Sequence, residues 1–536
     1  MAVVAVALAL AFAVDPRGDF PLNDDWAYAQ STGWLLEEGR IRLSDWVGMN
    51  LVPQILMGAA AVKAFGPGFE TLRHLTQAVA LASMAAAYAW FRCARFDAAG
   101  AFAATVAVVS FPAWAVLANS YMTDMYGFLL LVGAAACFAR SLEEPTPRLV
   151  LAGTLLSIVG VLQRQVALVV PFAFMVASLW TARPMTARRA IVAAAPFAAA
   201  MATQVAFHAY LAGAPGVPEG QRMLVGRLVP MAWAIVTNES GLRSIGIANA
   251  LSFAGYAGFF AVGWIAWGGL QGVPRRARWI VVAGGGALAA VALATGWLPP
   301  YNANNVIDPA GIGPFTLHDA WGDFAPLDRS AGFFWRAMGV AAAFGTVAMC
   351  GTLATAVVQM VRARRGADSL QVFVVSAIAG YAAPFVAIDF FDRYLLYVLP
   401  LAFVLWKVTW RDPQAGALPL RVPAAAWMLA SLLLGAAATR DYFSWNRMRW
   451  DAIHEAERLG GNADTIDGGF EYNAWRRYET LPRVRTPGKS WWWVKDDRYM
   501  VAFGPVAGYR QAAWWPARRW LPRSPAGVAL LERRVE

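Results

Sequence analysis

Apolar runs of about 20 residues recur along the first 440 residues of the chain, separated by short polar segments. A helix needs roughly 20 residues to cross the hydrocarbon core of a bilayer. Backbone groups in lipid must satisfy their own hydrogen bonds, so each run is expected to form a helix. The pattern therefore predicts an all-α polytopic membrane protein. The composition agrees, because 59% of the residues are hydrophobic and only 15% are charged.

Arginines gather in short clusters between these runs, at Arg92/Arg95, Arg183/Arg188/Arg189, Arg275/Arg276/Arg278 and Arg362/Arg364/Arg365. By the positive-inside rule, such clusters mark cytoplasmic loops, and a trace that places every cluster inside predicts about 13 spans. We expect the spans at residues 1–14, 71–91, 98–118, 125–140, 148–163, 165–181, 188–212, 246–270, 279–298, 331–361, 370–388, 395–410 and 422–439. Because the basic residues follow this pattern, the net charge of +11 is no sign of nucleic-acid binding.

The trace also predicts the segments outside the cytoplasm. Residues 15–70 form a first outer loop, in which 25–38 and 50–65 are expected as helices on the membrane surface. Further outer loops are expected at 213–244 and 299–330. Residues 1–14 are short for a span, and we interpret them as a helix with a clipped start. A signal peptide is the alternative; both place residue 15 outside.

The chain changes character after Arg440. Residues 441–536 have mixed charge, many aromatic residues and no apolar run long enough to span, and short strand-like runs occur at 499–503 and 528–531. We therefore divide the chain into a transmembrane domain, 1–440, and a small α+β extracytoplasmic domain, 441–536.

The unusual polar residues fall on the outer side of this trace. Asp24 and Asp25 follow the first apolar run, Asp124 lies at another membrane edge, and Arg164 lies in a polar turn that interrupts 148–181. The candidate catalytic residues are Asp24, Asp25 and Asp124. The candidate substrate-binding residues are Tyr28, Arg164, His318, Arg393 and Tyr394.

The order of these motifs resembles that of the type C glycosyltransferases, which take a sugar from a polyprenyl phosphate and transfer it outside the cytoplasm. The likeness is to the family of protein O-mannosyltransferases and bacterial aminoarabinose transferases. Asp24-Asp25-Trp26-Ala27-Tyr28 is similar to the family's acidic pair followed by Tyr, with Asp in place of the usual second Glu. Asp124, the turn at Arg164 and the run from Arg393 to Pro400 match later motifs. The resemblance covers roughly residues 1–440.

The resemblance implies an inverting glycosyltransferase in a bacterial inner membrane, with its active site on the periplasmic side. The implied partners are a polyprenyl-phosphate-linked sugar and a lipid, glycan or protein acceptor of the cell envelope. Relatives with a Lys in the first outer loop could use it to hold phosphate, but residues 45–50 contain none. Phosphate contact is then expected from Arg164, Arg393 or an outer-loop arginine such as Arg222 or Arg243.

The reaction class requires such residues. A base must take the acceptor proton as the anomeric carbon is attacked, and a carboxylate at a membrane edge can have the raised pKa that suits this role. We expect Asp24 to be this base. The charge that develops on the leaving phosphate needs arginines or a metal ion. The sequence assigns no metal ligand, although some relatives bind a divalent cation near the acids.

Several structural interpretations compete with these assignments. Asn23 or Asp24 could begin the surface helix as an N-cap, and Asp124 could cap the next span. Arg164 could pair with a neighbouring helix, Arg393 could pair with Asp389 or Asp392, and His318 could pair with Asp319. The rival classes of function are a lipid or glycan transporter or flippase and a non-catalytic cell-envelope assembly protein.

Overall fold

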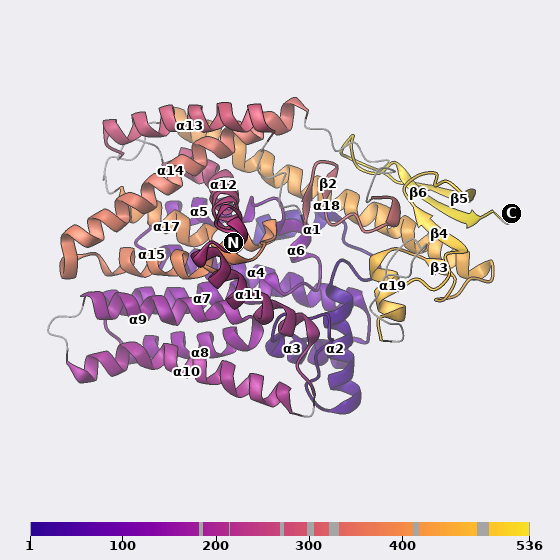
Figure 1. The fold of residues 1–536 in the computed structure, drawn as a ribbon, viewed down its shortest axis with the longest axis horizontal. Coiled ribbons are helices and arrows are strands. Elements are labelled where there is room, and N and C mark those ends of the chain that lie inside the picture. Colours follow the sequence, from indigo (N-terminus) through magenta and orange to yellow (C-terminus); the bar gives the residue numbers. More distant parts are fainter. Residues whose placement is uncertain are drawn as a thin grey trace.

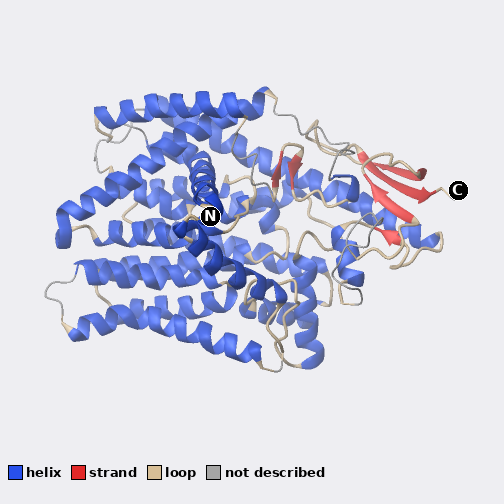
Figure 2. Cartoon of the chain, in the orientation of Figure 1, coloured by secondary structure: helices blue, strands red, loops and turns tan. Residues whose placement is uncertain are grey.

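The computed structural model describes residues 2–181, 186–213, 215–268, 273–296, 305–320, 332–410, 418–479 and 493–534. Most of these residues are helical, and the C-terminal strands gather at one end of the molecule (Figure 2). The helices outside the first outer loop are α1 (Ala2–Val14), α4 (Phe69–Cys93), α5 (Ala98–Val109), α6 (Trp114–Ala118), α7 (Asp124–Glu143), α8 (Pro147–Gln163), α9 (Val169–Thr181), α10 (Ala187–Ala212), α11 (Glu219–Thr237), α12 (Arg243–Gly268), α13 (Arg275–Thr295), α14 (Phe333–Ala363), α15 (Ser369–Ala382), α16 (Pro384–Ala387), α17 (Leu399–Thr409), α18 (Leu418–Arg458) and α19 (Phe470–Arg477).

Seven helical stretches are long and apolar enough to cross a bilayer: Asp124–Glu143, Ala187–Ala212, Glu239–Gly268, Arg275–Thr295, Phe333–Ala363, Ser369–Ala387 and Arg421–Arg458. Shorter apolar helices accompany them, including α5, α8 and α17. The chain is therefore a helical, multi-pass membrane protein. The expectation of about 13 spans remains a prediction.

Helices α7, α8, α9 and α10 lie side by side, and α12, α13 and α14 pack together in another part of the molecule (Figure 1). Helix α15 packs against both α9 and α14 and so links the two sets. Glycine allows the closest approach, because a Cβ atom at Gly345 of α14 would lie 2.1 Å from the Gly258 carbonyl oxygen of α12. Small residues at helix contacts are a usual means of close packing in membranes.

The first outer loop contains the two expected helices, α2 (Asp25–Glu38) and α3 (Val52–Phe65). The expected break in the long apolar stretch is also present, because α8 ends at Gln163 and a 3₁₀ turn, η1 (Gln165–Leu168), precedes α9. Leu51 donates its N–H to the Gln163 carbonyl at 3.1 Å, so this break is joined to the first outer loop.

The expected outer loop at 213–244 contains a helix that the sequence pattern did not indicate. In α11, charged residues and an internal Pro230 interrupt the apolar run. Val225, Val229, Trp233 and Val236 are nevertheless exposed, and their spacing places them on one side of the helix. Such an apolar stripe is typical of a helix that contacts lipid.

The described part of the expected outer loop at 299–330 forms a small hairpin, β1 (Ile307–Asp308) and β2 (Gly311–Ile312), and a 3₁₀ turn, η3 (His318–Ala320). The C-terminal strands form a four-stranded sheet of order β3-β4-β6-β5, made of β3 (Ile466–Asp467), β4 (Tyr499–Ala502), β5 (Tyr509–Pro516) and β6 (Gly527–Arg533). Strand β4 covers residues 499–502 of the strand-like run at 499–503, and β6 contains the run at 528–531. Helix α18 continues through the predicted boundary at residue 440, and the division into two domains remains a prediction.

Candidate active site

Asp24 lies at the start of α2, after a turn in which Asn23 has a positive φ of 54°. Its side chain caps no N–H of the helix, so the capping interpretation is wrong for this residue. Instead, Oδ1 accepts a hydrogen bond from Nε1 of Trp46 at 2.9 Å, and Oδ2 lies 3.6 Å from Nη2 of Arg393. The Asp24 side chain is 18% exposed, so it remains accessible to a second molecule.

Burial raises the pKa of Asp24 above its ordinary value, and the nearby Arg393 guanidinium and Trp46 indole oppose that rise. A carboxylate with a raised pKa is a stronger proton acceptor than a solvated one. Asp24 thus combines access with the basicity that proton removal from a hydroxyl requires.

The neighbouring Asp25 has a different environment. Its Oδ1 accepts the N–H of Leu22 at 2.6 Å, and its Oδ2 accepts the N–H of Tyr121 at 3.3 Å. Burial raises the pKa of this carboxyl to about 8. Asp25 thus joins the first outer loop to the segment before α7, and neither of its oxygens pairs with Arg393. A catalytic role for Asp25 remains a prediction.

Asp124 is the first residue of α7 and is fully buried. Its Oδ1 accepts a hydrogen bond from Nη1 of Arg164 at 2.9 Å, and its Oδ2 lies 3.8 Å from Nη1 of Arg393. Asp124 therefore lies between the two arginines, and Arg393 lies between Asp24 and Asp124. One guanidinium thus brings together two acids from distant parts of the chain.

Arg164 occupies the break between α8 and η1 in an extended conformation. Besides Asp124, its Nη1 contacts Oγ1 of Thr123 at 2.9 Å and the Tyr397 hydroxyl at 3.2 Å. This approach needs a glycine at position 127, because a Cβ there would lie 2.7 Å from the Tyr397 hydroxyl and 3.0 Å from Cδ of Arg164. Arg164 therefore pairs with a neighbouring helix, as the structural interpretation expected. Its partner on that helix, Asp124 of α7, belongs to the candidate site.

Arg393 and Tyr394 lie in the 3₁₀ turn η5 (Asp392–Tyr397). With three residues per turn, Tyr394 and Tyr397 share a face, and the Cζ atom of Arg164 lies 5.2 Å from the centroid of each ring. The Tyr394 ring is also 5.6 Å from Cζ of Arg393. Tyr394 thus packs against both guanidiniums, where cation–π attraction helps to hold them in place.

Among the described residues, the Arg393 guanidinium pairs with Asp24 and Asp124 and with neither Asp389 nor Asp392, so the interpretation of Arg393 as part of a local structural pair is wrong. The Asp392 carboxylate accepts backbone N–H groups of Asn305, Val306 and Ile307 at 2.7–3.2 Å. These bonds fasten the β1–β2 hairpin to the turn that carries Arg393. The hairpin is therefore part of the support of the candidate site.

Tyr28 and His318 complete the predicted set. Tyr28 is buried one helical turn after Asp24, and its hydroxyl makes no hydrogen bond to any described residue. His318 lies in η3, which packs against β4, and its neighbour Asp319 accepts the N–H groups of Phe503 and Gly504. Tyr28 thus belongs to the acidic cluster, whereas His318 belongs with the C-terminal sheet.

Two atoms in the cluster are buried and lack a hydrogen-bond partner among the described residues: Oδ2 of Asp124 and Nε of Arg393. Leaving such atoms unpaired is costly, and clusters of this kind are often completed by a ligand. One atom is an acceptor and the other a charged donor. A molecule with both a hydroxyl and an anionic group matches them chemically.

The resemblance left open a divalent cation near the acids. Asp24 and Asp124 are each compensated by an arginine. In the described ranges, no three side chains of His, Cys, Asp or Glu converge as a metal site. The residues present do not fit a divalent cation in this arrangement.

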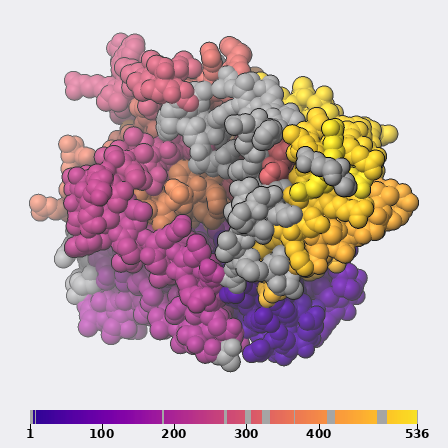
Figure 3. Space-filling model, turned by 45° about the vertical axis from the view of Figure 1, so that its right-hand side comes forward, coloured from indigo at the N-terminus to yellow at the C-terminus, as the bar shows by residue number. Residues whose placement is uncertain are grey.

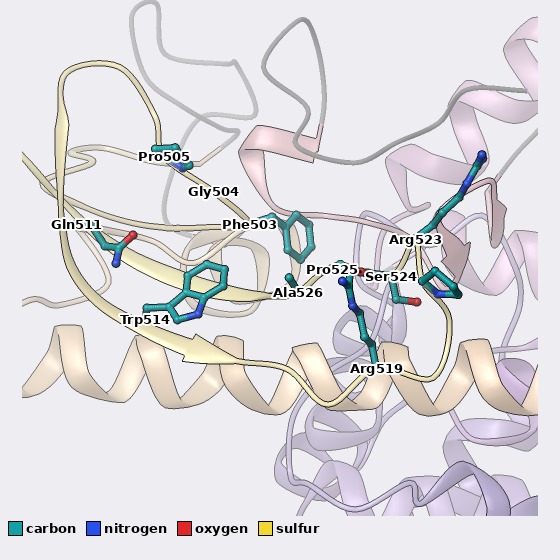
Figure 4. Close-up of a pocket in the computed structure, with 11 residues that line it drawn as sticks. Phe503, Gly504, Pro505, Gln511, Trp514, Arg519, Arg523, Ser524, Pro525 and Ala526 are labelled. Carbon is teal, nitrogen blue, oxygen red and sulfur yellow. Dashed lines mark hydrogen bonds between the residues drawn. The ribbon is translucent and has the colours of Figure 1, made fainter. Parts of the chain in front are cut away.

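The cavities outside the acidic cluster include two of large volume. One of about 890 Å³ lies in the C-terminal sheet, where Trp514, Arg519 and Arg523 line it (Figure 4). The other, about 640 Å³, lies between α12, α14, α18 and the β1–β2 hairpin, and its lining is mainly apolar. Through the hairpin, this second cavity adjoins the turn that carries Arg393.

Solved structures similar to this chain include the oligosaccharyltransferase of Archaeoglobus fulgidus in its apo form, with a TM-score of 0.39 and 13% identity over 84% of this chain. The chain spans 57% of that protein's length. They also include ArnT from Cupriavidus metallidurans bound to undecaprenyl phosphate, with a TM-score of 0.38, 14% identity and coverage of 88% of this chain and 83% of ArnT. The apo state of ArnT has a TM-score of 0.36 and 16% identity over the same shares. No protein-family model and no curated protein matches the chain.

Sequence reasoning missed several contacts of the site. The sequence pattern assigns no individual role to Trp46, in the segment 45–50, or to Tyr397, in the run from Arg393 to Pro400. Glu471, in the C-terminal segment, was not assigned a role, although it accepts the N–H of Asn23 at 3.0 Å. Tyr397 could have been found, because it follows Tyr394 by one 3₁₀ turn. Trp46 and Glu471 reach the site only through the tertiary fold.

Proposed function

We propose that this protein is an integral membrane glycosyltransferase that moves a sugar from a polyprenyl-phosphate carrier to a hydroxyl of an extracytoplasmic acceptor. The observation that carries the proposal is the bridging of Asp24 and Asp124 by Arg393. This arrangement supplies an accessible carboxylate beside buried positive charge. The reaction needs both, the first to accept a proton and the second to stabilise a departing phosphate.

In the proposed reaction, the acceptor oxygen attacks the anomeric carbon while its proton moves to the Asp24 carboxylate. The bond between that carbon and the carrier phosphate breaks, and the electron pair leaves on the phosphate oxygen. A single displacement of this kind inverts the anomeric centre. Asp24 is preferred as base over Asp124 because its side chain is 18% exposed, whereas that of Asp124 is fully buried.

The two arginines take different parts in this proposal. Arg164 contacts Asp124, Thr123 and Tyr397 through its Nη1 atom, which suits it to fix Asp124 in place. Arg393 keeps a buried Nε atom without a hydrogen-bond partner among the described residues. Arginine binds phosphate through two N–H groups at once, so Arg393 is the preferred contact of the carrier phosphate. The free hydroxyl of Tyr28 would contact the sugar or the acceptor.

The hydrocarbon chain of a lipid-linked substrate needs an apolar surface. The 640 Å³ cavity supports this part of the proposal, because Phe259, Trp335 and Trp427 line it and it adjoins the support of Arg393. Ligand cavities commonly have volumes of roughly 300–1,000 Å³ and a mainly apolar lining.

The proposed setting is a bacterial inner membrane with the site on the outer side. In this topology, residues 1–440 form about 13 spans, and residues 441–536 form an extracytoplasmic domain. The acceptor is a lipid, glycan or protein of the cell envelope.

Transfer can be tested in inner-membrane vesicles that contain endogenous acceptors, with radiolabelled polyprenyl-phosphate hexoses and pentoses. Asp24→Asn is expected to slow transfer by roughly 10²–10⁴-fold, the usual contribution of a general base. Asp124→Asn should also impair transfer. Asp19→Asn is the control, since Asp19 is an exposed residue of the same loop. Equal transfer by all variants would contradict the proposal and would favour a transporter or an assembly protein.

Topology needs its own test at exposed positions. Arg40 and Arg188 are exposed. In a variant without the three native cysteines, an impermeant maleimide should label Arg40→Cys in intact cells. It should label Arg188→Cys only after permeabilisation. The reverse result would overturn the orientation.

A further inference from the structure

The turn that carries Asp24 is held from the C-terminal segment of the chain. Figure 3 shows C-terminal residues, in yellow, against N-terminal residues, in indigo. Where they meet, Oε1 of Glu471 accepts the N–H of Asn23 at 3.0 Å. Asn23 has a positive φ of 54°, a conformation that few residues other than glycine adopt and that Asn tolerates best. The bond therefore fixes an unusual backbone conformation immediately before Asp24.

Glu471 is itself held by buried partners. Its Oε2 lies 2.7 Å from Nη1 of Arg449 and accepts the Thr316 hydroxyl at 2.6 Å, and neither charged side chain is exposed. Nε of Arg449 donates to the Gly468 carbonyl at 2.7 Å. The cost of desolvating two charges makes such a pair a poor source of stability. Its position beside Asn23 calls for another explanation.

A second set of contacts runs from the same segment to Asp24 through Trp46. Phe470 and Trp493 enclose the Trp46 ring, with centroids 5.6 and 5.7 Å away. Tyr478 contacts the same ring edge-on at 6.1 Å. The enclosed indole donates its N–H to Oδ1 of Asp24. The C-terminal segment thus reaches Asp24 by two routes, through the backbone before it and through the donor to its carboxylate.

We propose that the Glu471–Arg449 pair is a positioning device by which the C-terminal segment holds the Asn23-Asp24 turn in its reactive geometry. This inference rests on the proposed function, since it assigns the pair to the site of sugar transfer. Glu471 is a positioning residue and does not contact the reacting atoms. A C-terminal segment in this role is a part of the active site rather than an appended domain.

The charges around Asp24 determine the sign of a pH test. The charged and titratable groups that interact with Asp24 are Arg393 of η5, Glu471 of α19, Tyr28 of α2 and Tyr442 of α18. Behind them, Arg449 pairs with Glu471, Asp124 pairs with Arg393, and Asp25 interacts with Tyr442. Burial raises the pKa of Asp24, and the negative charge of Glu471 adds to that rise. Replacing Glu471 with Gln removes this charge and leaves that of Arg449. The pKa of Asp24 should then fall.

Glu471→Gln keeps an acceptor for the Asn23 N–H, whereas Glu471→Ala removes it. In the transfer assay, Glu471→Gln should move the acidic limb of kcat/KM to lower pH. Glu471→Ala should lower kcat by roughly 10–100-fold with little change in the KM for the donor, because misplacing a reacting group costs about that much. Thr316→Val keeps both charges and removes one donor to Glu471, so it should lower kcat by a smaller factor. This variant tests the positioning role if Glu471→Ala fails to fold.

A readout independent of activity separates this inference from the proposed function. Hydrogen exchange of the peptide containing Asn23 and Asp24, measured in nanodiscs, should accelerate in Glu471→Ala and change little in Glu471→Gln. Glu455→Ala is the control, since Glu455 pairs with Arg458 at the surface of α18. Unchanged exchange together with an unchanged acidic limb would overturn the positioning role. If Glu471→Ala alters the exchange but the wild-type protein transfers no sugar, the contact with Asn23 is supported and the proposed function is overturned.

Discussion

Asp24, before α2, and Asp124, at the start of α7, share a single guanidinium, that of Arg393. The two distances, 3.6 and 3.8 Å, are ion-pair contacts rather than tight hydrogen bonds. Nε of Arg393 and Oδ2 of Asp124 have no hydrogen-bond partner within the described ranges. A cluster that is charge-balanced yet incompletely bonded is suited to receive a substrate with both anionic and hydroxyl groups.

Arg393→Lys should keep the charge balance and still impair transfer. A lysine carries one ammonium on a flexible chain and cannot face two carboxylates and a phosphate at fixed angles. We expect kcat to fall by roughly 10²-fold, as for the loss of one preorganised donor. Thermal unfolding in detergent should change little. Arg498→Lys is the control, because Arg498 forms an exposed ion pair with Glu532. Unaltered transfer by Arg393→Lys would exclude a role for the guanidinium.

Trp46→Phe should move the acidic limb of kcat/KM to higher pH. The indole N–H stabilises the ionised form of Asp24 and opposes the rise of its pKa caused by burial. Without that donor the pKa of Asp24 rises further. A base acts only when deprotonated, so as the pH is lowered, activity is lost earlier, at a higher pH than in the wild type. This shift is opposite in sign to the one expected for Glu471→Gln.

Trp26→Phe is the matched control for that measurement. Trp26 belongs to the same aromatic group, with its ring 6.2 Å from that of Trp46, and its Nε1 has no hydrogen-bond partner among the described residues. The pH profile of this variant should match that of the wild type. Equal shifts in both tryptophan variants would attribute the effect to packing rather than to the hydrogen bond.

The parts of this arrangement that follow from local pattern could be predicted from the sequence. Polar residues in a long apolar run indicate a break, and the helices do part at Arg164. The apolar runs and arginine clusters predicted a loop at 15–70 with two helices, and α2 and α3 are present there. Local pattern cannot show that Asp24 meets Arg393, because periodicity carries no information on which loops pack together.

The contribution of the C-terminal segment could not be predicted either, because local pattern does not show which distant segments pack together. Glu471 looks like a turn residue in its own surroundings, and only the folded chain places it against Asn23. Helix α11 was missed because charges and Pro230 reduce its mean hydropathy, while its apolar side is visible only as a spacing of three and four residues. The sequence also cannot distinguish Asp25 from Asp24, because the two acids are adjacent. In the fold, Asp25 accepts backbone N–H groups and does not contact Arg393.

Gly127→Ala should disturb the contact between Arg164 and Tyr397. The added Cβ would lie 2.7 Å from the Tyr397 hydroxyl, and overpacking of this kind costs about 1–3 kcal/mol. We expect a lower unfolding temperature and slower transfer. Gly133→Ala on the same helix is the control, because a Cβ there would meet only Leu156, at an ordinary 3.5 Å. Equal effects at both positions would show that α7 needs glycine for a reason unrelated to the site.

Ala430→Phe should weaken binding of the lipid-linked donor without affecting the chemical step. Ala430 lines the apolar cavity between α14 and α18, so a phenyl ring there competes with a hydrocarbon chain. We expect the KM for a long-chain donor to rise about tenfold, which corresponds to about 1.4 kcal/mol. The KM for a short-chain donor should stay unchanged, because its chain does not reach the cavity. Ala425→Phe, at an exposed position of the same helix outside the cavity, controls for added bulk. If Ala430→Phe impairs both donors equally, the cavity does not hold the chain.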